Sequence, residues 1–545
     1  MTRKEFLKKL GLGAFGLVIG RSMIGKALAA PIYQNGGNFP IIIIGTGYGS
    51  AVSAERLAQA GHQVLMLEMG LDWDGYKQQN PGFKFPKMTS PSKQSTWMNT
   101  KPQAPIELGN MANFDKFTGI LERVDYDHIK IYQGKGVGGG SLVNGGMTVT
   151  PDRNYFKQVF EDVGVNFTEQ ELDDFFNVYF PRANTNVGRQ VAPQDVVDSE
   201  WYKFARVGIQ EGVAAGFTPV DVPNLYDFEH MRQEIAGNAP RSATNIEVLY
   251  GNNHGKQDLT KTYIKRALNT GNVTILPQHK VDHIIENYDG TFTLKVQQID
   301  TLNRDVCIKE FTCEKLFVGA GSLGTTELLQ KSKYLGKLKK LNDEVGKYWG
   351  NNGNVMASRR SNADFFGHTS RGANQSTMPI RGLDNFNDPV YPFFAEIAPM
   401  PTLGSLTSLY LIVNKLKRFG KLSYDGYRRK LQLEWDARHT AHMRTNAEYF
   451  LNQMNEHGSK SNFGSKFINN TTFFPNNGVD ESICYHPLGG VVLGKATDMF
   501  GRLKGYSNLY VMDGSLIPGT LGVNPYVSIT AIAERNIEHI INHDF

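Results

Sequence analysis

The sequence predicts an α/β fold in which a domain with a parallel sheet is built from discontinuous segments, with α+β insertions between them. Ile41–Ile44 and Leu316–Val318 are uninterrupted apolar runs, typical of parallel strands that are buried on both faces. Each run leads directly into a glycine-rich turn, at Gly45–Gly49 and Gly319–Gly324. The chain of 545 residues is long enough for roughly two to four domains.

The composition excludes several classes of protein. Apolar residues make up 40% of the chain and charged residues 20%, as in a globular protein. Three cysteines are too few for a disulfide scaffold. The net charge of +5 comes from residues 1–29, which are strongly basic, whereas acidic and basic side chains balance in the rest of the chain. We therefore expect no nucleic-acid partner.

The N-terminal residues have the features of an export signal. Basic residues at Arg3 and Lys4 precede the apolar run Leu10–Gly20, which is too short to span a bilayer. Small residues at Ala27–Ala29 provide a cleavage pattern, so residues 1–29 predict a removed signal and a secreted or periplasmic protein. The opening resembles a twin-arginine signal with Lys4 in place of the second arginine. An ordinary secretory signal or an amphipathic helix remains the alternative.

A dinucleotide-binding unit is predicted directly after this leader. The turn Gly45–Gly49 follows the first apolar strand, and a short helix and a second strand, Val64–Leu67, come next. Glycines at 45, 47 and 49 allow the backbone to approach a pyrophosphate at a helix N-terminus. Glu68 ends the second strand, where a carboxylate can hold the ribose hydroxyls. This fingerprint alone does not distinguish NAD from FAD.

Three later segments complete the unit and favour FAD. Gly134–Met147 is rich in glycine, so its backbone amides can lie against a flat ring or a phosphate. Its interleaved apolar residues disfavour a flexible surface loop. Leu316–Gly324 is a further strand and turn, and Asn508–Gly514 is a strand that ends in an acid before a final helix, Ser528–Ile541.

These blocks resemble the glucose–methanol–choline flavin oxidoreductases, and within them the bacterial cholesterol oxidases that hold FAD noncovalently. The resemblance implies a Rossmann-like FAD-binding domain from residues 38–150, 256–355 and 482–545. It implies a steroid-binding domain from residues 151–255 and 356–481, with a mixed sheet that roofs the flavin. The matching blocks are Gly45–Gly70, Gly134–Met147, Tyr250–Lys256, Val318–Leu329, Phe394–Pro401, Tyr485–Lys495 and Leu509–Val527.

Three residues are candidates for catalysis. A histidine suits proton transfer near neutral pH, and an amide can position a hydroxyl without carrying a charge. His486 and Asn524 meet these needs, and the resemblance implies that the pair lies over the flavin and holds the substrate hydroxyl. Glu396 lies in an apolar run, where burial can raise a carboxyl pKa toward neutrality. The resemblance makes it the base that moves a steroid proton from C4 to C6; a structural ion pair is the alternative.

The resemblance also assigns residues to the cofactor. Glu68 is expected at the ribose and Val281 at the adenine, and the glycine-rich loop at the isoalloxazine ring. That loop offers no counterpart of the histidine that binds flavin covalently in some relatives. His439 and His442 are spaced for one helical face, but without an acidic or cysteine partner we expect no metal. The expected cofactor-binding residues are Gly45, Gly47, Tyr48, Gly49, Glu68, Gly138, Gly139, Gly140, Asn144, Gly145, Met147, Val281, Asp513, Gly514 and Tyr526.

Together these features lead us to expect an oxidase of the 3β-hydroxyl of cholesterol and related sterols. Dioxygen would be the electron acceptor, hydrogen peroxide a product, and the 5-en-3-one would be isomerised to the 4-en-3-one. We expect a monomer that touches lipid membranes transiently, with Trp73–Met88 as a candidate lid. The alternatives are an oxidase or dehydrogenase of another bulky alcohol, and a catalytically silent protein that binds flavin or sterol.

Overall fold

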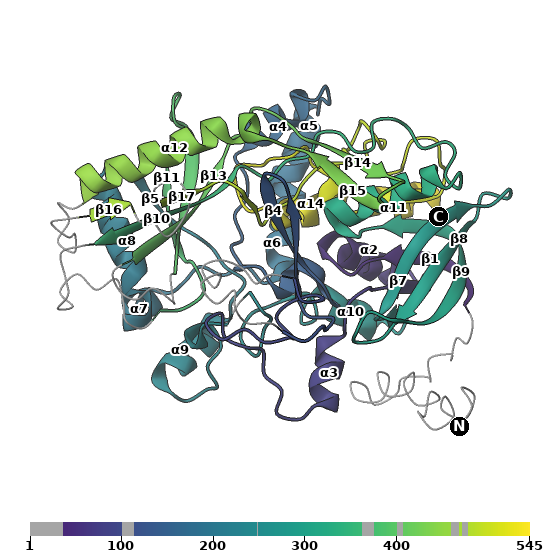
Figure 1. The fold of residues 1–545 in the computed structure, drawn as a ribbon, viewed down its shortest axis with the longest axis horizontal. Helices are drawn as coiled ribbons and strands as arrows, with labels where there is room; N and C mark the ends of the chain where they lie inside the picture. Colours follow the sequence, from purple (N-terminus) through teal and green to yellow (C-terminus); the bar gives the residue numbers. More distant parts are fainter. Residues whose placement is uncertain are drawn as a thin grey trace.

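The computed structural model contains two seven-stranded sheets, which lie side by side with a smaller sheet between them (Figure 1). It describes residues 36–100, 114–247, 249–361, 375–399, 407–458, 468–470 and 478–545. The predicted leader, residues 1–29, lies outside the described residues. Among the residues described, no helix combines the length and the apolar character that crossing a membrane requires.

The first sheet confirms the predicted parallel core. The four isoleucines of β1 are at most 5% exposed, and β1 lies between β2 and β9, parallel to both. Strands β6 and β19 extend the parallel part, whereas β8 and β7 add an antiparallel edge. The strands are β1 (Gly37–Ile44), β2 (Val64–Leu67), β6 (Val273–Leu276), β7 (His279–Glu286), β8 (Phe292–Ile299), β9 (Asp305–Val318) and β19 (Leu509–Val511).

Helices from distant parts of the chain pack around this sheet. Helix α2 (Tyr48–Gln59) contacts both α10 (Tyr263–Asn269) and α14 (Tyr526–Asp544). Helix α11 (Gly321–Tyr334) contacts β7 and the hairpin of β14 (Lys421–Asp425) and β15 (Lys430–Glu434). Both α2 and α14 begin beside the central strands, so their first turns approach one another at the ends of these strands.

The segment after the glycine-rich loop packs on the first sheet's core, although we expected residues 151–255 in the second domain. Phe156, Phe175 and Phe180 belong to the same buried cluster as the isoleucines of β1. The apolar pattern of this segment predicts burial, but periodicity does not say which partner covers the apolar face. The helices are α4 (Arg153–Glu161), α5 (Glu169–Asp174) and α6 (Phe180–Val187), of which α6 contacts α14.

The second sheet has the order β16-β10-β13-β12-β11-β5, with β17 beside β10. We expected a mixed sheet, but every pairing of its described strands is antiparallel. The connections from β11 to β12 and from β12 to β13 are shorter than the dozen or more residues that a parallel crossover needs. The strands are β5 (Thr218–Asp221), β10 (Asn354–Ser361), β11 (Arg381–Asp384), β12 (Phe393–Ala398), β13 (Thr407–Asn414), β16 (Ile468–Asn470) and β17 (Val479–Asp480).

Helices cover one face of this second sheet. Helices α8 (Lys203–Ala214) and α12 (Ala437–Glu456) contact its strands, and Figure 1 shows α12 running along them. Ile397 of β12 points to this helical face, because it lies against Gly208 of α8. Successive side chains of a strand alternate between faces, so the neighbouring Glu396 points to the opposite face. That face is turned toward the first domain.

The smaller sheet links the two halves. Strand β4 (Ile129–Gly134) pairs with β3 (Leu121–Tyr126) and, in parallel, with β18 (Ile483–Cys484), and β4 lies centrally in Figure 1. Strand β4 leads into the glycine-rich loop, and β18 ends two residues before His486. The predicted lid contains α3 (Trp73–Gln79), and its residues Trp73 and Phe85 are buried. The remaining α-helices of the described residues are α7 (Gln194–Asp198) and α9 (Phe228–Ala236).

Candidate active site

A cavity of about 1150 Å³ extends from the turn after β1 to the strands β12 and β13 of the second sheet. It brings together the three candidate catalytic residues, Glu396, His486 and Asn524. It is also lined by all the expected cofactor-binding residues except Gly138. Residues that are far apart in the sequence thus face one common space.

The turn after β1 needs its glycines for different reasons. Gly45 has a φ of +88°, and a Cβ there would clash with the carbonyl oxygen of Gly319. A Cβ on Gly49 would clash with the carbonyl oxygen of Met512. A Cβ on Gly47 would meet no protein atom, because Gly47 faces the cavity. Gly47 also begins α2 without a side-chain cap, so the helix N-terminus can receive an anion such as a pyrophosphate.

Glu68 is held by two neighbours at the edge of the cavity. Its Oε2 atom accepts a hydrogen bond of 2.6 Å from the hydroxyl of Thr46, and its Oε1 atom accepts one of 2.8 Å from the backbone N–H of Gly70. The N–H of Gly138 donates to the same Thr46 hydroxyl at 3.0 Å. Gly138 therefore ties the glycine-rich loop to β1 from behind. Burial raises the pKa of the Glu68 carboxyl, and the Thr46 and Gly70 hydrogen bonds oppose that shift.

Asp513 joins the end of β19 to the start of α11. Its Oδ2 atom accepts hydrogen bonds from the N–H of Gly321 at 2.9 Å and the hydroxyl of Thr325 at 2.5 Å. Its Oδ1 atom accepts from the N–H and the hydroxyl of Ser515. Asp513 lines the cavity with all of these bonds in place, so it fixes the backbone around the cavity.

The glycine-rich loop touches both the β1 turn and the last helix. A Cβ on Gly139 would lie 3.0 Å from the Cα atom of Gly47, so the two glycine turns are in close contact. The side-chain N–H of Asn144 donates to the Tyr48 hydroxyl at 2.7 Å, while the Oδ1 atom of Asn144 is buried without a partner among the described residues. The Tyr526 hydroxyl donates to the carbonyl oxygen of Gly146 at 3.1 Å.

Two buried residues with no role assigned from sequence hold this loop from outside the cavity. The ammonium group of Lys256 donates to the carbonyl oxygens of Leu142 and Asn144, at 3.0 and 3.1 Å. Asn224 donates to the carbonyl oxygen of Gly145 at 3.1 Å. Burial lowers the pKa of Lys256 to about 7. The only sequence signal was the matching block that ends at Lys256.

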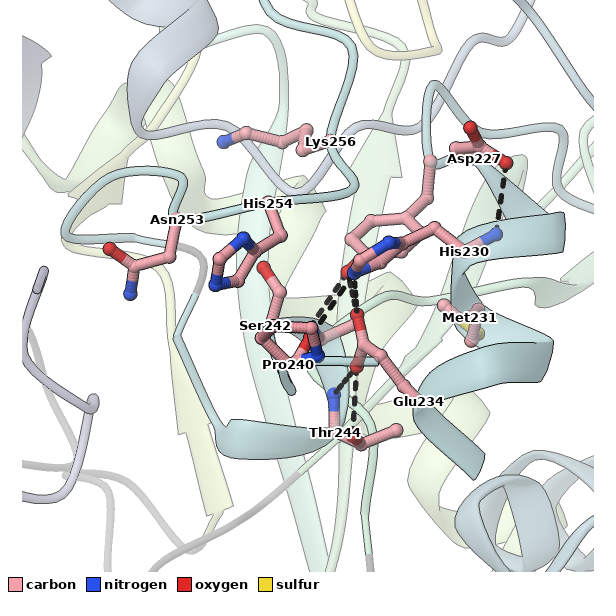
Figure 2. Close-up of polar contacts among 12 residues, drawn as sticks. Asp227, His230, Met231, Glu234, Pro240, Ser242, Thr244, Asn253, His254 and Lys256 are labelled. Carbon is pink, nitrogen blue, oxygen red and sulfur yellow. Dashed lines mark hydrogen bonds and ion pairs between the residues drawn. The ribbon is translucent and has the colours of Figure 1, made fainter. Parts of the chain in front are cut away.

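The segment that carries Lys256 packs against a polar cluster around Glu234 (Figure 2). Glu234 accepts hydrogen bonds from the N–H and the hydroxyl of Thr244, at 3.0 and 2.8 Å, and one from Tyr226. The ring of His230 lies against that of His254, with ring centroids 5.8 Å apart. None of these residues lines the cavity, so the cluster supports the loop from outside the site.

Glu396 and Asn524 are the unpartnered polar groups at the far end of the cavity. Neither oxygen of the fully buried Glu396 carboxyl has a hydrogen-bond partner among the described residues, and the same holds for Oδ1 of Asn524. Burial raises the pKa of Glu396 to about 8. The nearby Asn524 amide opposes that shift, although the two side chains do not meet in ordinary hydrogen-bond geometry. Such buried, unsatisfied groups need a ligand or water.

His486 reaches the same space from the loop after β18. Its Nδ1 atom lies 3.0 Å from the side-chain nitrogen of Asn354 and 3.4 Å from that of Asn352. Burial lowers the pKa of His486 to about 3, so the ring is neutral. Neither asparagine was predicted from the sequence, although the run Asn351–Asn354, with three asparagines around a glycine, was a visible signal.

The wall of the cavity nearest to Glu396 is largely apolar, because apolar side chains of the second sheet contribute to it. Among the described residues, no group of three or more histidine, cysteine or acidic side chains is placed to hold a metal ion. His439 and His442 make hydrogen bonds within the protein instead. His439 bonds Asp436 at the N-cap of α12, and His442 bonds the carbonyl oxygen of Lys415. The apolar wall comprises Met147, Met356, Pro379, Ala398, Leu409 and Leu411.

The sequence of this chain matches the models of one protein family along most of its length. The N-terminal domain of the GMC oxidoreductases matches residues 31–348, more than half of the chain. The chain belongs to the GMC oxidoreductase family. Two C-terminal matches, to residues 352–464 and 421–533, extend the assignment through the second sheet to α14. The protein is therefore an FAD-dependent oxidoreductase, as the glycine turns indicated.

Several relatives in this family are similar over their whole length. The cholesterol oxidase of Mycobacterium tuberculosis H37Rv is 24% identical, with 91% of this chain and 90% of the relative aligned. The cholesterol oxidase of Acinetobacter baumannii is 23% identical, with 93% and 95% aligned. An oxygen-dependent choline dehydrogenase of Pseudomonas putida is 25% identical, but only 54% of this chain and 47% of that protein align.

Solved structures show the same GMC fold. Pyridoxine 4-oxidase from Mesorbium loti superposes with a TM-score of 0.62 at 14% identity, covering 93% of this chain and all of that chain. Formate oxidase from Aspergillus oryzae superposes with a TM-score of 0.61, again at 14% identity, covering 94% and all of that chain. These likenesses confirm the two-domain α/β architecture.

The residues of this chain fit FAD. Gly47 and Gly140 face the cavity and a Cβ on either would project into open space, which leaves room for a ligand against the bare backbone. Helices α2 and α14 both begin at the cavity without side-chain caps. Asn144 also lines the cavity, and its buried Oδ1 atom, which has no partner among the described residues, can accept a hydrogen bond from a ligand. The cavity is thus long and polar at the nucleotide end and apolar at the opposite end.

Proposed function

We propose that this protein oxidises the 3β-hydroxyl of a sterol, with cholesterol as the leading substrate, and isomerises the product. Dioxygen is the proposed acceptor and hydrogen peroxide the second product. The observation that carries the proposal is Glu396, a fully buried carboxyl that has no hydrogen-bond partner among the described residues and faces the same cavity as His486 and Asn524. Alcohol oxidation alone does not need such a group, whereas a proton shift on an apolar substrate does.

The oxidation step uses His486 and Asn524 to orient the substrate hydroxyl. Both side chains have polar atoms available to a ligand, namely the Nε2 atom of His486 and the Oδ1 atom of Asn524. Bound FAD supplies the redox chemistry by accepting the hydride from the carbinol carbon. A hydroxyl fixed by two such groups presents that hydrogen in one orientation, which is the contribution of positioning to rate.

The isomerisation step uses Glu396 as the base. Its carboxylate removes a proton from C4 of the 5-en-3-one, the double bond moves from C5–C6 to C4–C5, and the same proton is returned to C6. A carboxyl with a pKa of about 8 is suited to both halves of this step, because it can accept and then release a proton near neutral pH. The apolar wall formed by the second sheet keeps water away from the dienol intermediate of the steroid.

We further propose that FAD is bound noncovalently, that Trp73–Met88 acts as a lid and that the protein is exported. Gly134–Met147 contains no histidine or cysteine, which supports noncovalent FAD.

Met88 at the end of the candidate lid lines the cavity, so movement of Trp73–Met88 would open it toward a lipid surface during sterol uptake. Export to a secreted or periplasmic location is proposed from residues 1–29 and tested by N-terminal sequencing of the recovered protein. The proposed monomeric state is tested by size-exclusion chromatography.

The deciding experiment is aerobic incubation of the FAD-loaded protein with cholesterol, while conjugated-enone absorbance and peroxide are followed in the same sample. The proposal expects both signals to rise together. The Glu396→Gln variant is expected to release peroxide but to lose most enone formation, with the peroxide signal as the internal control for folding. Equal enone formation by this variant removes Glu396 from the role.

The same assay separates the alternatives. Turnover of another bulky alcohol but not of cholesterol favours the same fold with a different substrate, and the partial match to choline dehydrogenases makes choline one compound to include. Flavin reduction without peroxide indicates an acceptor other than dioxygen. A flavin that no alcohol reduces indicates a silent binding protein.

A further inference from the structure

Two asparagines that do not themselves line the cavity face His486 from behind. Asn352 precedes β10 and Asn354 is its first residue. The side-chain nitrogens of both point at the Nδ1 atom of His486, at 3.4 and 3.0 Å. Both asparagines are fully buried, so these contacts are not shared with bulk water.

The orientation of each amide is determined by a second bond. The Oδ1 atom of Asn352 accepts from the backbone N–H of Leu521 at 2.7 Å. The Oδ1 atom of Asn354 accepts from the backbone N–H of Tyr485 at 3.1 Å. A backbone N–H can only donate, so neither amide can be turned around without breaking this bond. The nitrogen of each amide must therefore face the histidine.

The local backbone also favours asparagine at the first of these positions. Asn352 has a φ of +57°, a left-handed conformation that asparagine tolerates better than most residues. Its side-chain nitrogen makes a further bond of 2.7 Å to the carbonyl oxygen of Val523, next to Asn524. One side chain thus links the histidine to the loop that carries the second candidate catalytic residue.

We propose that Asn352 and Asn354 are positioning residues that fix the tautomer of His486. Because both amides donate, Nδ1 is an acceptor and carries no proton, so the proton of the neutral ring is on Nε2. The Nε2 atom has no partner among the described residues, so it offers an N–H to the ligand in the cavity. His486 then meets a substrate hydroxyl as a hydrogen-bond donor, and the unpartnered Oδ1 atom of Asn524 can accept from that hydroxyl.

Solution NMR of the FAD-loaded protein with ¹⁵N-labelled histidine tests the tautomer directly. Thirteen histidines contribute signals, and the set lost in His486→Gln identifies this ring. The proposal expects a protonated Nε2 and an unprotonated Nδ1 at neutral pH, without any substrate present. A proton on Nδ1 in the unmodified protein overturns it.

Two variants test the asparagines. In Asn354→Asp the retained oxygen still accepts from the N–H of Tyr485, but the second oxygen replaces the nitrogen that faced Nδ1 and can only accept. We therefore expect the proton on Nδ1 and the signals to show a protonated Nδ1 and an unprotonated Nε2. Asn352→Asp makes the same change through Leu521 and serves if the first variant does not fold. Unchanged ring signals in a folded variant contradict the proposal.

The control and the kinetic readout separate positioning from general packing. Asn342→Asp changes another asparagine, whose oxygen accepts from the backbone N–H of Glu344 and whose nitrogen donates to the carbonyl oxygen of Ala496, neither of which bonds His486. It is expected to leave the His486 signals unchanged. With any alcohol that is turned over, Asn354→Asp is expected to lower kcat at least tenfold with a smaller change in KM. This part rests on the proposed role of His486, whereas the NMR result stands if the sterol assignment fails.

Discussion

Tyr48 and Tyr526 stack face to face, with ring centroids 4.7 Å apart and an angle of 20° between the rings. Tyr48 is the first residue of α2 and Tyr526 the first of α14, so the pair holds two helix N-termini together at the cavity. The hydrogen bonds of the same tyrosines to Asn144 and Gly146 extend this contact to the glycine-rich loop. Elements from three separate parts of the chain thus form one wall of the cavity.

Substitution of two glycines in the β1 turn distinguishes cofactor contact from packing. Gly47→Ala adds a Cβ that meets only the cavity, so we expect FAD binding to weaken by at least tenfold while the stability of the FAD-free protein stays within about 0.5 kcal/mol. Gly49→Ala adds a Cβ that clashes with the carbonyl oxygen of Met512, so it should destabilise the protein without FAD as well. Flavin titration and urea unfolding measure the two effects.

The hydroxyl of Thr46 connects three parts of the nucleotide site. Thr46→Val keeps the side-chain shape but leaves the N–H of Gly138 and one oxygen of Glu68 without their partner, which should cost about 1–3 kcal/mol. We expect weaker FAD binding and lower stability together. Ser53→Ala is the matched control, because that buried hydroxyl bonds only to the carbonyl oxygen of Gly49 within α2. Equal effects of the two variants on FAD affinity would contradict a special role for Thr46.

The nucleotide half could be predicted because its signals are local. The isoleucines of β1, the glycine turn and Glu68 lie within one short stretch, and this stretch also contains β2, with which β1 pairs. The structure places Ile41 opposite Val64, as a parallel pair of buried strands demands. The apolar run around Glu396 was likewise sufficient to predict its burial.

The residues that hold His486 and the partners of the inserted helices depend on contacts between distant parts of the chain, which no local sequence pattern predicts. Asn352 and Asn354 lie more than 130 residues before His486, and a buried asparagine looks the same in sequence whether it orients a histidine or caps a turn. The packing of α4, which contains Phe156, on the core of the first sheet could not be predicted for a similar reason, since an apolar helix face does not indicate which surface covers it. Strand direction in the second sheet was also not encoded locally.

The raised pKa of Glu396 predicts a pH dependence of stability. The folded-state value of about 8 lies above the ordinary carboxyl value of 4.5, so this contribution to the free energy of unfolding is fully present below pH 4.5 and is lost as pH rises through 8. A shift of this size corresponds to at most about 5 kcal/mol. Glu396→Gln cannot ionise, so it should lose less stability between pH 5 and pH 9 than the unmodified protein.

Urea unfolding at a series of pH values checks this expectation, with excess FAD in every sample so that cofactor release is the same. Asn524→Ala removes the amide that opposes the shift and should move the pH midpoint further upward. Parallel stability curves for Glu396→Gln and the unmodified protein would mean that the carboxyl ionises at an ordinary pH.

The lowered pKa of His486 predicts the opposite slope in acid. The folded-state value of about 3 lies below the unfolded value of 6.5, so the contribution of the neutral ring is fully present above pH 6.5 and is lost as pH falls toward 3. His486→Gln should therefore lose less stability between pH 7 and pH 4 than the unmodified protein.

Substrate oxidation should likewise show no acid limb near pH 6.5 from this ring, because the Asn352 and Asn354 donors leave Nδ1 as an acceptor and the ring stays neutral. Titration of the assigned His486 signals near pH 6.5 would contradict both expectations.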